Sequence, residues 1–140
     1  MDLDEVQDVV ESAAREVGGL SVSSERDGGY ITILIRPSPP GGSGPLPADR
    51  RVRIWTSGAE AFFIDVPAGF GHQEFDHAHE GQVAILHLLV SLAGEYLRGR
   101  FEEKEEPRPF GRARRYLEIT AGGQSYRLYR KQVEAQKLCR

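Results

Sequence analysis

Histidine and carboxylate side chains gather in one short segment of this chain. Residues 69–80, GFGHQEFDHAHE, contain three of the four histidines and three carboxylates, and they stand directly before the longest apolar run. His77 and His79 are two residues apart, so an extended backbone would project both imidazoles to one face. With His72 and the nearby carboxylates they would form a ligand set that suits zinc, iron or manganese. One hypothesis is therefore a metal-binding protein or a metal-dependent enzyme.

Two interpretations of this segment compete, a metal motif and a polar connector that leads into a helix. In favour of the metal motif, five residues separate Gly71 from His77, a spacing that is similar to the opening of the cupin metal motif, Gly, five residues, His-x-His. A cupin then needs a glutamate inside a strand, whereas here Val83 and Ala84 stand in a helical run. As a connector, the segment would place Asp76 at the helix N-cap and its carboxylates near the positive helix end. We favour the connector and expect no cofactor.

Motifs for nucleophilic catalysis and for phosphate binding are missing from the sequence. There is no G-x-S-x-G, and the glycine-rich stretch 41–44 is followed by proline rather than by Gly-Lys-Ser. Cys139 is the one cysteine, which excludes an intramolecular disulfide and a cysteine metal site. His87 lies in the apolar helical run, where a core histidine with one satisfied hydrogen bond is the ordinary interpretation. We therefore expect no catalytic residues.

Arginines and tyrosines interleave near the C-terminal end of the chain. If the two strands expected there pair as a hairpin, their side chains cluster on one sheet. The candidate partner-binding residues are Arg112, Arg114, Tyr116, Tyr126, Arg127 and Tyr129. This cluster has three interpretations: a solvated strand face that balances the acidic run 102–106, a surface for an acidic protein partner, or a platform on which nucleic-acid bases stack.

Net charge and composition narrow the classes of partner. The chain has a net charge of −3 and a pI near 5.8, which makes nucleic acid an unlikely partner because phosphate binding depends on a basic surface. The acidic N-terminus lacks the pattern of a signal peptide, and no apolar run reaches the length of a membrane span. We expect a cytoplasmic protein with no membrane partner.

Apolar periodicity predicts two helices. In the first, apolar residues recur on one face from Leu3 to Val17, and Asp2 with Glu5 makes a possible capping box. The second covers residues 81–100 and has so wide an apolar arc that we expect it to be buried on most sides.

Alternating or β-branched runs and glycine turns predict about six strands. We expect strands at 20–25, 30–36, 50–57, 61–66, 114–120 and 124–130. In the second hairpin, Val52, Ile54 and Phe63 are the inward candidates. Residues 37–49 form a flexible Pro/Gly-rich loop, and residues 131–140 form a tail or a short helix.

This order of elements indicates the fold class. At 140 residues the chain is the size of one domain, so we assign residues 1–140 to a single α+β domain. Helices that segregate around an antiparallel sheet make a two-layer sandwich, here with an N-terminal helix and one long buried helix after the fourth strand.

The order of features resembles small α+β immunity proteins of bacterial polymorphic toxin systems. The matching residues stand between a strand and the second helix, and they are Gly69, Phe70, Gly71, His72, Phe75 and Asp76. In the order of elements the resemblance spans residues 51–130. It implies a cytoplasmic, non-catalytic protein that blocks a cognate toxin by occupying its active site.

These observations lead to one first hypothesis and two alternatives. The first is a non-catalytic protein-binding module, an immunity-type inhibitor of a bacterial toxin. The alternatives are a metal site at the three clustered histidines and a nucleic-acid surface at the C-terminal arginines.

Overall fold

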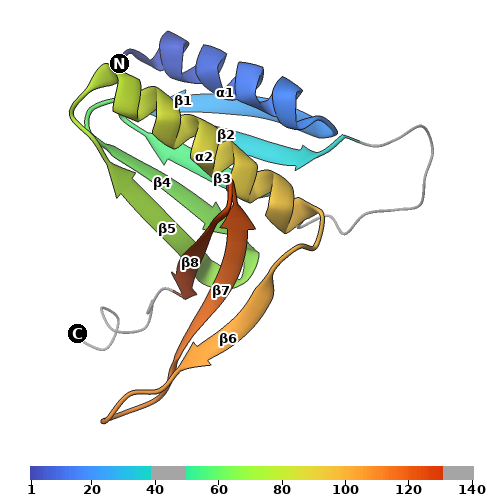
Figure 1. Ribbon diagram of the computed structural model, residues 1–140. Coiled ribbons are helices and arrows are strands. Elements are labelled where there is room, and N and C mark those ends of the chain that lie inside the picture. Colours follow the sequence, from blue (N-terminus) through green and yellow to red (C-terminus); the bar gives the residue numbers. More distant parts are fainter. Residues whose placement is uncertain (39–49, 131–140) are drawn as a thin grey trace.

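The computed structural model describes residues 1–38 and 50–130 (Figure 1). The tail predicted at 131–140 and nearly all of the loop predicted at 37–49 lie outside these residues. Pro37, which we assigned to the loop, is instead the last residue of a strand.

Within the described residues, two helices cover one face of an eight-stranded antiparallel sheet (Figure 1). In chain order the elements are α1 (Leu3–Val17), β1 (Leu20–Asp27), β2 (Tyr30–Pro37), β3 (Val52–Thr56), β4 (Ala61–Val66), the short 3-10 helix η1 (Pro67–Gly69), β5 (Phe70–Phe75), α2 (His79–Leu97), β6 (Glu102–Glu106), β7 (Arg114–Ala121) and β8 (Gln124–Arg130). The strand order across the sheet is β1-β2-β3-β4-β5-β8-β7-β6. The predicted α+β class is confirmed.

Helix α1 begins where the sequence predicts. The Asp2 carboxylate accepts a hydrogen bond of 2.8 Å from the backbone N–H of Glu5, which satisfies one of the free donors of the first turn. The reciprocal half of the capping box is not made, because the Glu5 carboxylate bonds instead to the imidazole of His79 in α2. Val6 and Val10 are fully buried against the sheet and α2.

Helix α2 begins two residues before the predicted start, and Asp76 is not its N-cap. The N-cap is Ala78, whose backbone N–H donates a 2.8 Å hydrogen bond to the Asp76 carboxylate. Gly81 packs directly against that carboxylate, since a Cβ built on Gly81 would lie 2.0 Å from Asp76 Oδ2. Asp76 therefore holds the turn that leads into α2.

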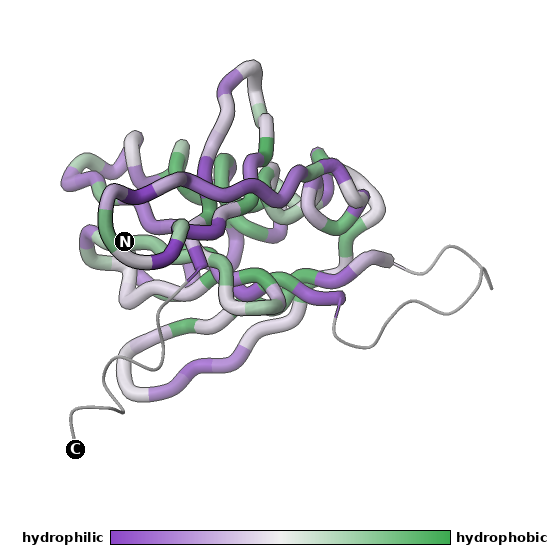
Figure 2. The backbone as a smooth tube through the Cα atoms, turned by 90° about the horizontal axis from the view of Figure 1, so that it is seen from below, coloured by the Kyte–Doolittle hydropathy of each residue, from purple (hydrophilic) through white to green (hydrophobic). Residues whose placement is uncertain are grey.

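The core lies between the two helices and one face of the sheet. Its fully buried large side chains come from α1, α2 and strands β2, β3, β4, β7 and β8: Val6, Ile31, Ile33, Ile35, Ile54, Phe62, Ile64, Leu86, Leu89, Leu92, Ile119 and Leu128. Every second residue of β4, and of β2 from Ile31 to Ile35, is buried, as expected when one sheet face is packed and the other is solvated. Figure 2 shows how hydrophobic and hydrophilic residues are distributed along the backbone.

One predicted core residue points the other way. Val52 and Ile54 are fully buried as expected, but on β4 the buried side chains are Phe62, Ile64 and Val66. Phe63 lies half-buried on the opposite face of the sheet, where it stacks on Trp55. The prediction for Phe63 was wrong because the run Phe-Phe-Ile is apolar at every position, and so leaves the alternation undecided.

The predicted strand count was too low, because β5 and β6 have little apolar character. β5 (FGHQEF) has one buried residue, Phe70, so its sequence predicts a polar connector rather than a strand. β6 (EEKEE) has no apolar residue, and is held at the sheet edge by pairing with β7 and by ion pairs such as Lys104–Glu118 and Arg115–Glu103. The long helix consequently follows the fifth strand, not the fourth.

Candidate functional site

The sheet is nearly divided between β5 and β8. All six residues of β5 pair with β4, but only two pair with β8, as Phe70 with Arg130 and Gly71 with Tyr129. Beyond these two pairs the strands diverge, and the hairpin of β7 and β8 swings away from β4 and β5 (Figure 1). We call the opening between residues 72–75 of β5 and 124–128 of β8 the fork.

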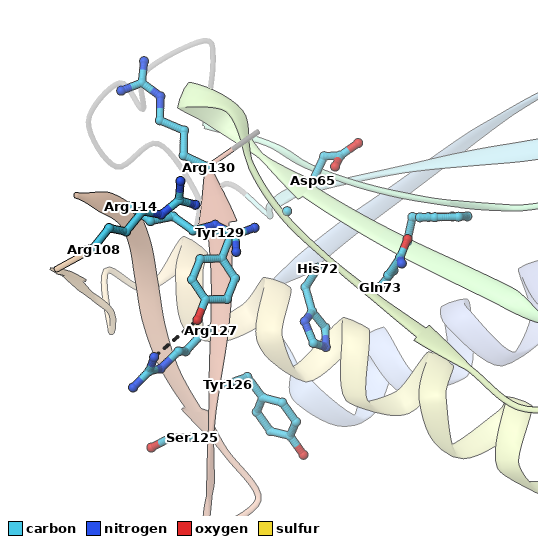
Figure 3. Close-up of a pocket in the computed structure, with 12 residues that line it drawn as sticks. Asp65, His72, Gln73, Arg108, Arg114, Ser125, Tyr126, Arg127, Tyr129 and Arg130 are labelled. Atoms are coloured by element: carbon cyan, nitrogen blue, oxygen red, sulfur yellow. Dashed lines mark hydrogen bonds between the residues drawn. The ribbon is translucent and has the colours of Figure 1, made fainter. Parts of the chain in front are cut away.

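A cavity of about 860 Å³ occupies the fork and the adjoining sheet face, and we call it the fork cavity (Figure 3). It is lined by Phe63, Asp65, Gly71, His72, Gln73, Arg108, Arg114, Ser125, Tyr126, Arg127, Tyr129 and Arg130. In Figure 3 the arginines stand on the β7 and β8 side, while Asp65, His72 and Gln73 come from β4 and β5. The two halves of the sheet therefore contribute different chemistry to the cavity.

The lining of the fork cavity is cationic, although the protein as a whole is acidic. Four arginines and one aspartate face the cavity, in a chain whose net charge is −3. Arg127 has an ion pair, with its Nη1 3.6 Å from Glu106. No carboxylate among residues 1–38 and 50–130 lies within ion-pair distance of Arg108, Arg114 or Arg130. Glu106 also stands opposite Arg114 across β6 and β7, so the described residues balance part of this charge and leave the cavity lining with more positive than negative groups.

Two of these arginines are held by tyrosine rings. Arg114 lies over Tyr129, with its Cζ atom 3.9 Å from the ring centroid, and Arg127 lies 4.5 Å above the ring of Tyr116. Arg127 Nη1 also donates to the Tyr129 hydroxyl at 3.3 Å, which raises the already high pKa of the guanidinium. Because these contacts restrict both guanidinium groups, less side-chain entropy is lost when they bind an anion.

His72 and Tyr126 meet across the helix side of the fork. Their ring centroids are 6.1 Å apart in an edge-on arrangement. His72 Nε2 lies 2.7 Å from a carboxylate oxygen of Glu74, and the Tyr126 hydroxyl donates to the Gln124 side chain at 2.8 Å. These contacts place polar groups on the helix side of the fork.

An aromatic row adjoins the fork on the sheet face that the described helices leave uncovered. Tyr30, Trp55 and Phe63 lie on neighbouring strands, and the rings of Trp55 and Phe63 stack with centroids 4.0 Å apart. Asp65 anchors the row, since it accepts hydrogen bonds from Trp55 Nε1 at 2.9 Å and from Arg53 at 2.8 Å. Asp65 also borders a second, smaller hollow of about 570 Å³. We call this uncovered surface, from β2 to β8, the open face.

The predicted partner-binding residues are largely brought together. Arg114, Tyr126, Arg127 and Tyr129 all line the fork cavity. Tyr116 is buried beneath Arg127, with 7% of its surface exposed, so it supports the site rather than lining it.

Arg112, the sixth predicted residue, lies in the exposed loop between β6 and β7 and is not among the lining residues.

Sequence reasoning missed the part of the site that comes from β4 and β5. Phe63, Asp65 and Gln73 lie far from the C-terminal hairpin in the sequence, and β5 was not recognised as a strand. Strict alternation from Phe70 would have placed Gln73 on the open face, since Gly71, Gln73 and Phe75 share one side of β5.

The three histidines of the predicted metal site are not brought together. His72 pairs with Glu74, and His77 Nδ1 lies 3.0 Å from Glu60 in the turn after β3. His79 pairs with a third carboxylate, on α1. The extended backbone that the metal alternative needs at the His-x-His pair is not present, because a bend at His77 leads directly into α2. Within the described ranges, no three His, Cys, Asp or Glu side chains form a group that could hold a metal ion.

His87 is not the core residue that the apolar run suggested. Its side chain is 40% exposed, and Nδ1 lies 3.8 Å from a carboxylate oxygen of Glu16 on α1. Each of the four histidines therefore lies beside a glutamate carboxylate.

Neither α1 nor α2 combines the length and the apolar character that crossing a bilayer requires. Comparisons with protein-family models, with curated proteins and with solved structures find no significant match to this chain.

Proposed function

We propose that this protein is a non-catalytic binding module that holds an acidic surface of a partner protein against its open face. We further propose, following the resemblance to immunity proteins, that the partner is a toxin whose active site is occluded in the cytoplasm. The observation that carries the proposal is the charge of the fork, where Arg108, Arg114 and Arg130 lack a carboxylate partner within the described residues.

Charge complementarity identifies the kind of partner. A group of arginines at one cleft attracts acidic ligands to that cleft, even though the whole protein carries a net charge of −3. Arginine suits this role because its planar donors match a carboxylate in bidentate geometry.

Exposed aromatic groups supply the apolar part of such an interface. Phe75 at the end of β5 is 60% exposed and Tyr30 is 45% exposed, both on the open face. Phe110, in the loop between β6 and β7, is 88% exposed. Large aromatic side chains beside arginines are the residue types that dominate binding energy in protein interfaces.

The nucleic-acid alternative is less well supported by the same residues. Bases stack on free aromatic faces, whereas Arg114 and Arg127 already lie over the rings of Tyr129 and Tyr116. A base would have to displace a guanidinium from each ring. We therefore favour carboxylates of a protein over phosphates and bases.

The test is capture of the partner from the source cells by wild-type protein and by two matched charge reversals. Arg114→Glu reverses a charge in the fork, and Arg15→Glu makes the same change on the exposed side of α1. We expect Arg114→Glu to lose the partner and Arg15→Glu to retain it. Arg108→Glu, which disturbs no described ion pair or ring contact, serves as a second fork variant.

The captured protein then tests the immunity function. We expect it to stop growth when expressed alone and to be harmless when co-expressed with wild-type protein, but not with Arg114→Glu. A partner that binds all variants equally would contradict the open face as the interface. A partner that is harmless alone would contradict the toxin assignment.

A further inference from the structure

The hydrogen bond that ends β5 determines which way its backbone groups point. The N–H of Asp76 donates to the carbonyl of Glu60 at 3.1 Å, on the β4 side. Because alternate residues of an antiparallel strand direct their N–H and C=O groups to the same neighbour, Glu74 and His72 also bond toward β4. The backbone groups of Gly71, Gln73 and Phe75 therefore point toward β8.

The same parity applies to β8. Gly71 pairs with Tyr129, so these two residues face each other across the closed end of the fork. Arg127 and Ser125 follow at alternate positions, and their backbone groups point toward β5. Beyond the closed end, no described residue pairs with either strand across the fork. Two strand edges thus face each other, and among the described residues their backbone donors and acceptors have no partner strand.

We propose that an extended acidic segment of the partner enters the fork and adds as a strand to β5, with backbone hydrogen bonds to Gln73 and Phe75. This inference rests on the proposed function and names its structural mode. Strand addition to an unpaired edge is a common way in which proteins bind extended peptides, since the main chain provides affinity and the side chains provide selectivity.

The neighbouring side chains favour β5 as the pairing edge and carboxylates as the opposing groups. Gln73 and Phe75 are exposed on the open face, so they leave room for a strand beside them. Across the fork the segment would face Arg127, and toward the closed end it would face Arg114. In an extended segment, acidic residues at alternate positions point to one face. That face would be the open face, where Arg114 and Arg127 can bind their carboxylates.

The outer edges of the sheet offer no equivalent charge. β6 has the sequence EEKEE, which repels an acidic strand. On β1 the one cation, Arg26, is already paired with Asp4 at 2.6 Å. Among the described residues, the fork is the free strand edge that arginines flank.

The test uses a phage-displayed library of random peptides, selected against the whole protein, followed by synthesis of the enriched sequences. We expect peptides with Asp or Glu at alternate positions. In hydrogen-exchange NMR, bound peptide should protect the amides of Gln73 and Phe75, which should exchange faster than those of His72 and Glu74 in the free protein.

Two substitutions at one position separate backbone pairing from side-chain contact. Gln73→Pro removes the donor that faces the fork and leaves the β4 ladder intact, as proline is tolerated where its nitrogen faces away from the ladder. Gln73→Ala keeps the donor and removes the side chain. We expect peptide binding to weaken by about ten-fold or more in Gln73→Pro and to change little in Gln73→Ala.

Several outcomes would overturn the inference. These are an absence of acidic peptides from the selection, unprotected Gln73 and Phe75 amides in the complex, protection confined to Ser125 and Arg127, or equal binding by Gln73→Pro and Gln73→Ala. If Gln73→Pro does not fold, the exchange data decide alone. If the native partner needs Arg114 but leaves the amides of Gln73 and Phe75 unprotected, strand addition is wrong and the proposed function stands. If the partner binds Arg114→Glu as well as it binds the wild type, both proposals are wrong.

Discussion

Phe62 and Phe63 are adjacent phenylalanines on opposite faces of β4, so they allow a matched test of which face is the core. Phe62 is fully buried between the sheet and the helices, while Phe63 is half-buried on the open face. The perturbation is the same truncation at each position, Phe62→Ala and Phe63→Ala. The two variants have the same composition and differ only in the face that loses a ring.

The structure sets the size of each effect. Truncation of Phe62 loses a full phenylalanine and leaves a core cavity, which costs about 3–5 kcal/mol. Truncation of Phe63 loses a stack with Trp55, at 4.0 Å between centroids, and part of one side chain's burial. That sum is about 1–2 kcal/mol. We therefore expect the free energies of unfolding to differ by about 2 kcal/mol or more.

Urea denaturation followed by circular dichroism measures both values, provided that the denaturant slopes agree. If Phe62→Ala proves too unstable to purify, Phe62→Leu gives a milder version of the same comparison. An equal or larger loss of stability in Phe63→Ala would refute the assignment of the two faces. The folded Phe63→Ala protein should also bind the partner more weakly, since its ring lines the fork cavity.

Three further predictions concern local structure. Gly81→Ala should lower the unfolding free energy of the wild-type protein, because the new Cβ displaces the Asp76 carboxylate. In an Asp76→Ala background the same substitution should raise the unfolding free energy by about 1 kcal/mol, since alanine favours the helix more than glycine does. A double-mutant cycle measures both effects. Ala68 has a positive φ of 72°, so Ala68→Gly should raise the unfolding free energy by about 0.5–1 kcal/mol in denaturation experiments. The hydrogen bond from Lys104 lowers the pKa of Glu118 below its ordinary value of 4.5, so this pair contributes stability above that pH and loses it as the pH falls through the folded-state pKa. Carboxyl NMR titration should show the Glu118 midpoint rising in Lys104→Gln, and an unchanged midpoint would contradict the contact.

The helices and three hairpins were predictable because local signals specify them. The 3.6-residue period of α1, the apolar run of α2 and the glycine pairs at 28–29 and 122–123 each determine an element without reference to the rest of the chain. The clustering of Arg114, Arg127 and Tyr129 followed from the last hairpin for the same reason.

The fork was not predictable because it depends on where pairing between β5 and β8 stops. These strands are separated in sequence by α2, β6 and β7, and nothing local indicates that only two of their residues pair. β5 itself has a weak strand signal, as its interior residues Gly71, His72, Gln73 and Glu74 are small or polar. The side of β4 on which Phe63 lies was ambiguous for a related reason, since three consecutive apolar residues fit either register.

The face that the partner covers can be measured directly on the one tryptophan of the chain. Trp55 lies on the open face, and its indole N–H is a single, resolvable NMR signal. When the unlabelled partner is added to ¹⁵N-labelled protein, we expect this indole signal and the side-chain signals of Arg114 and Arg127 to shift or broaden, while the amides of α1 remain unchanged. Changes confined to α1 and the outer surface of α2, with the Trp55 signal unaffected, would contradict binding at the open face.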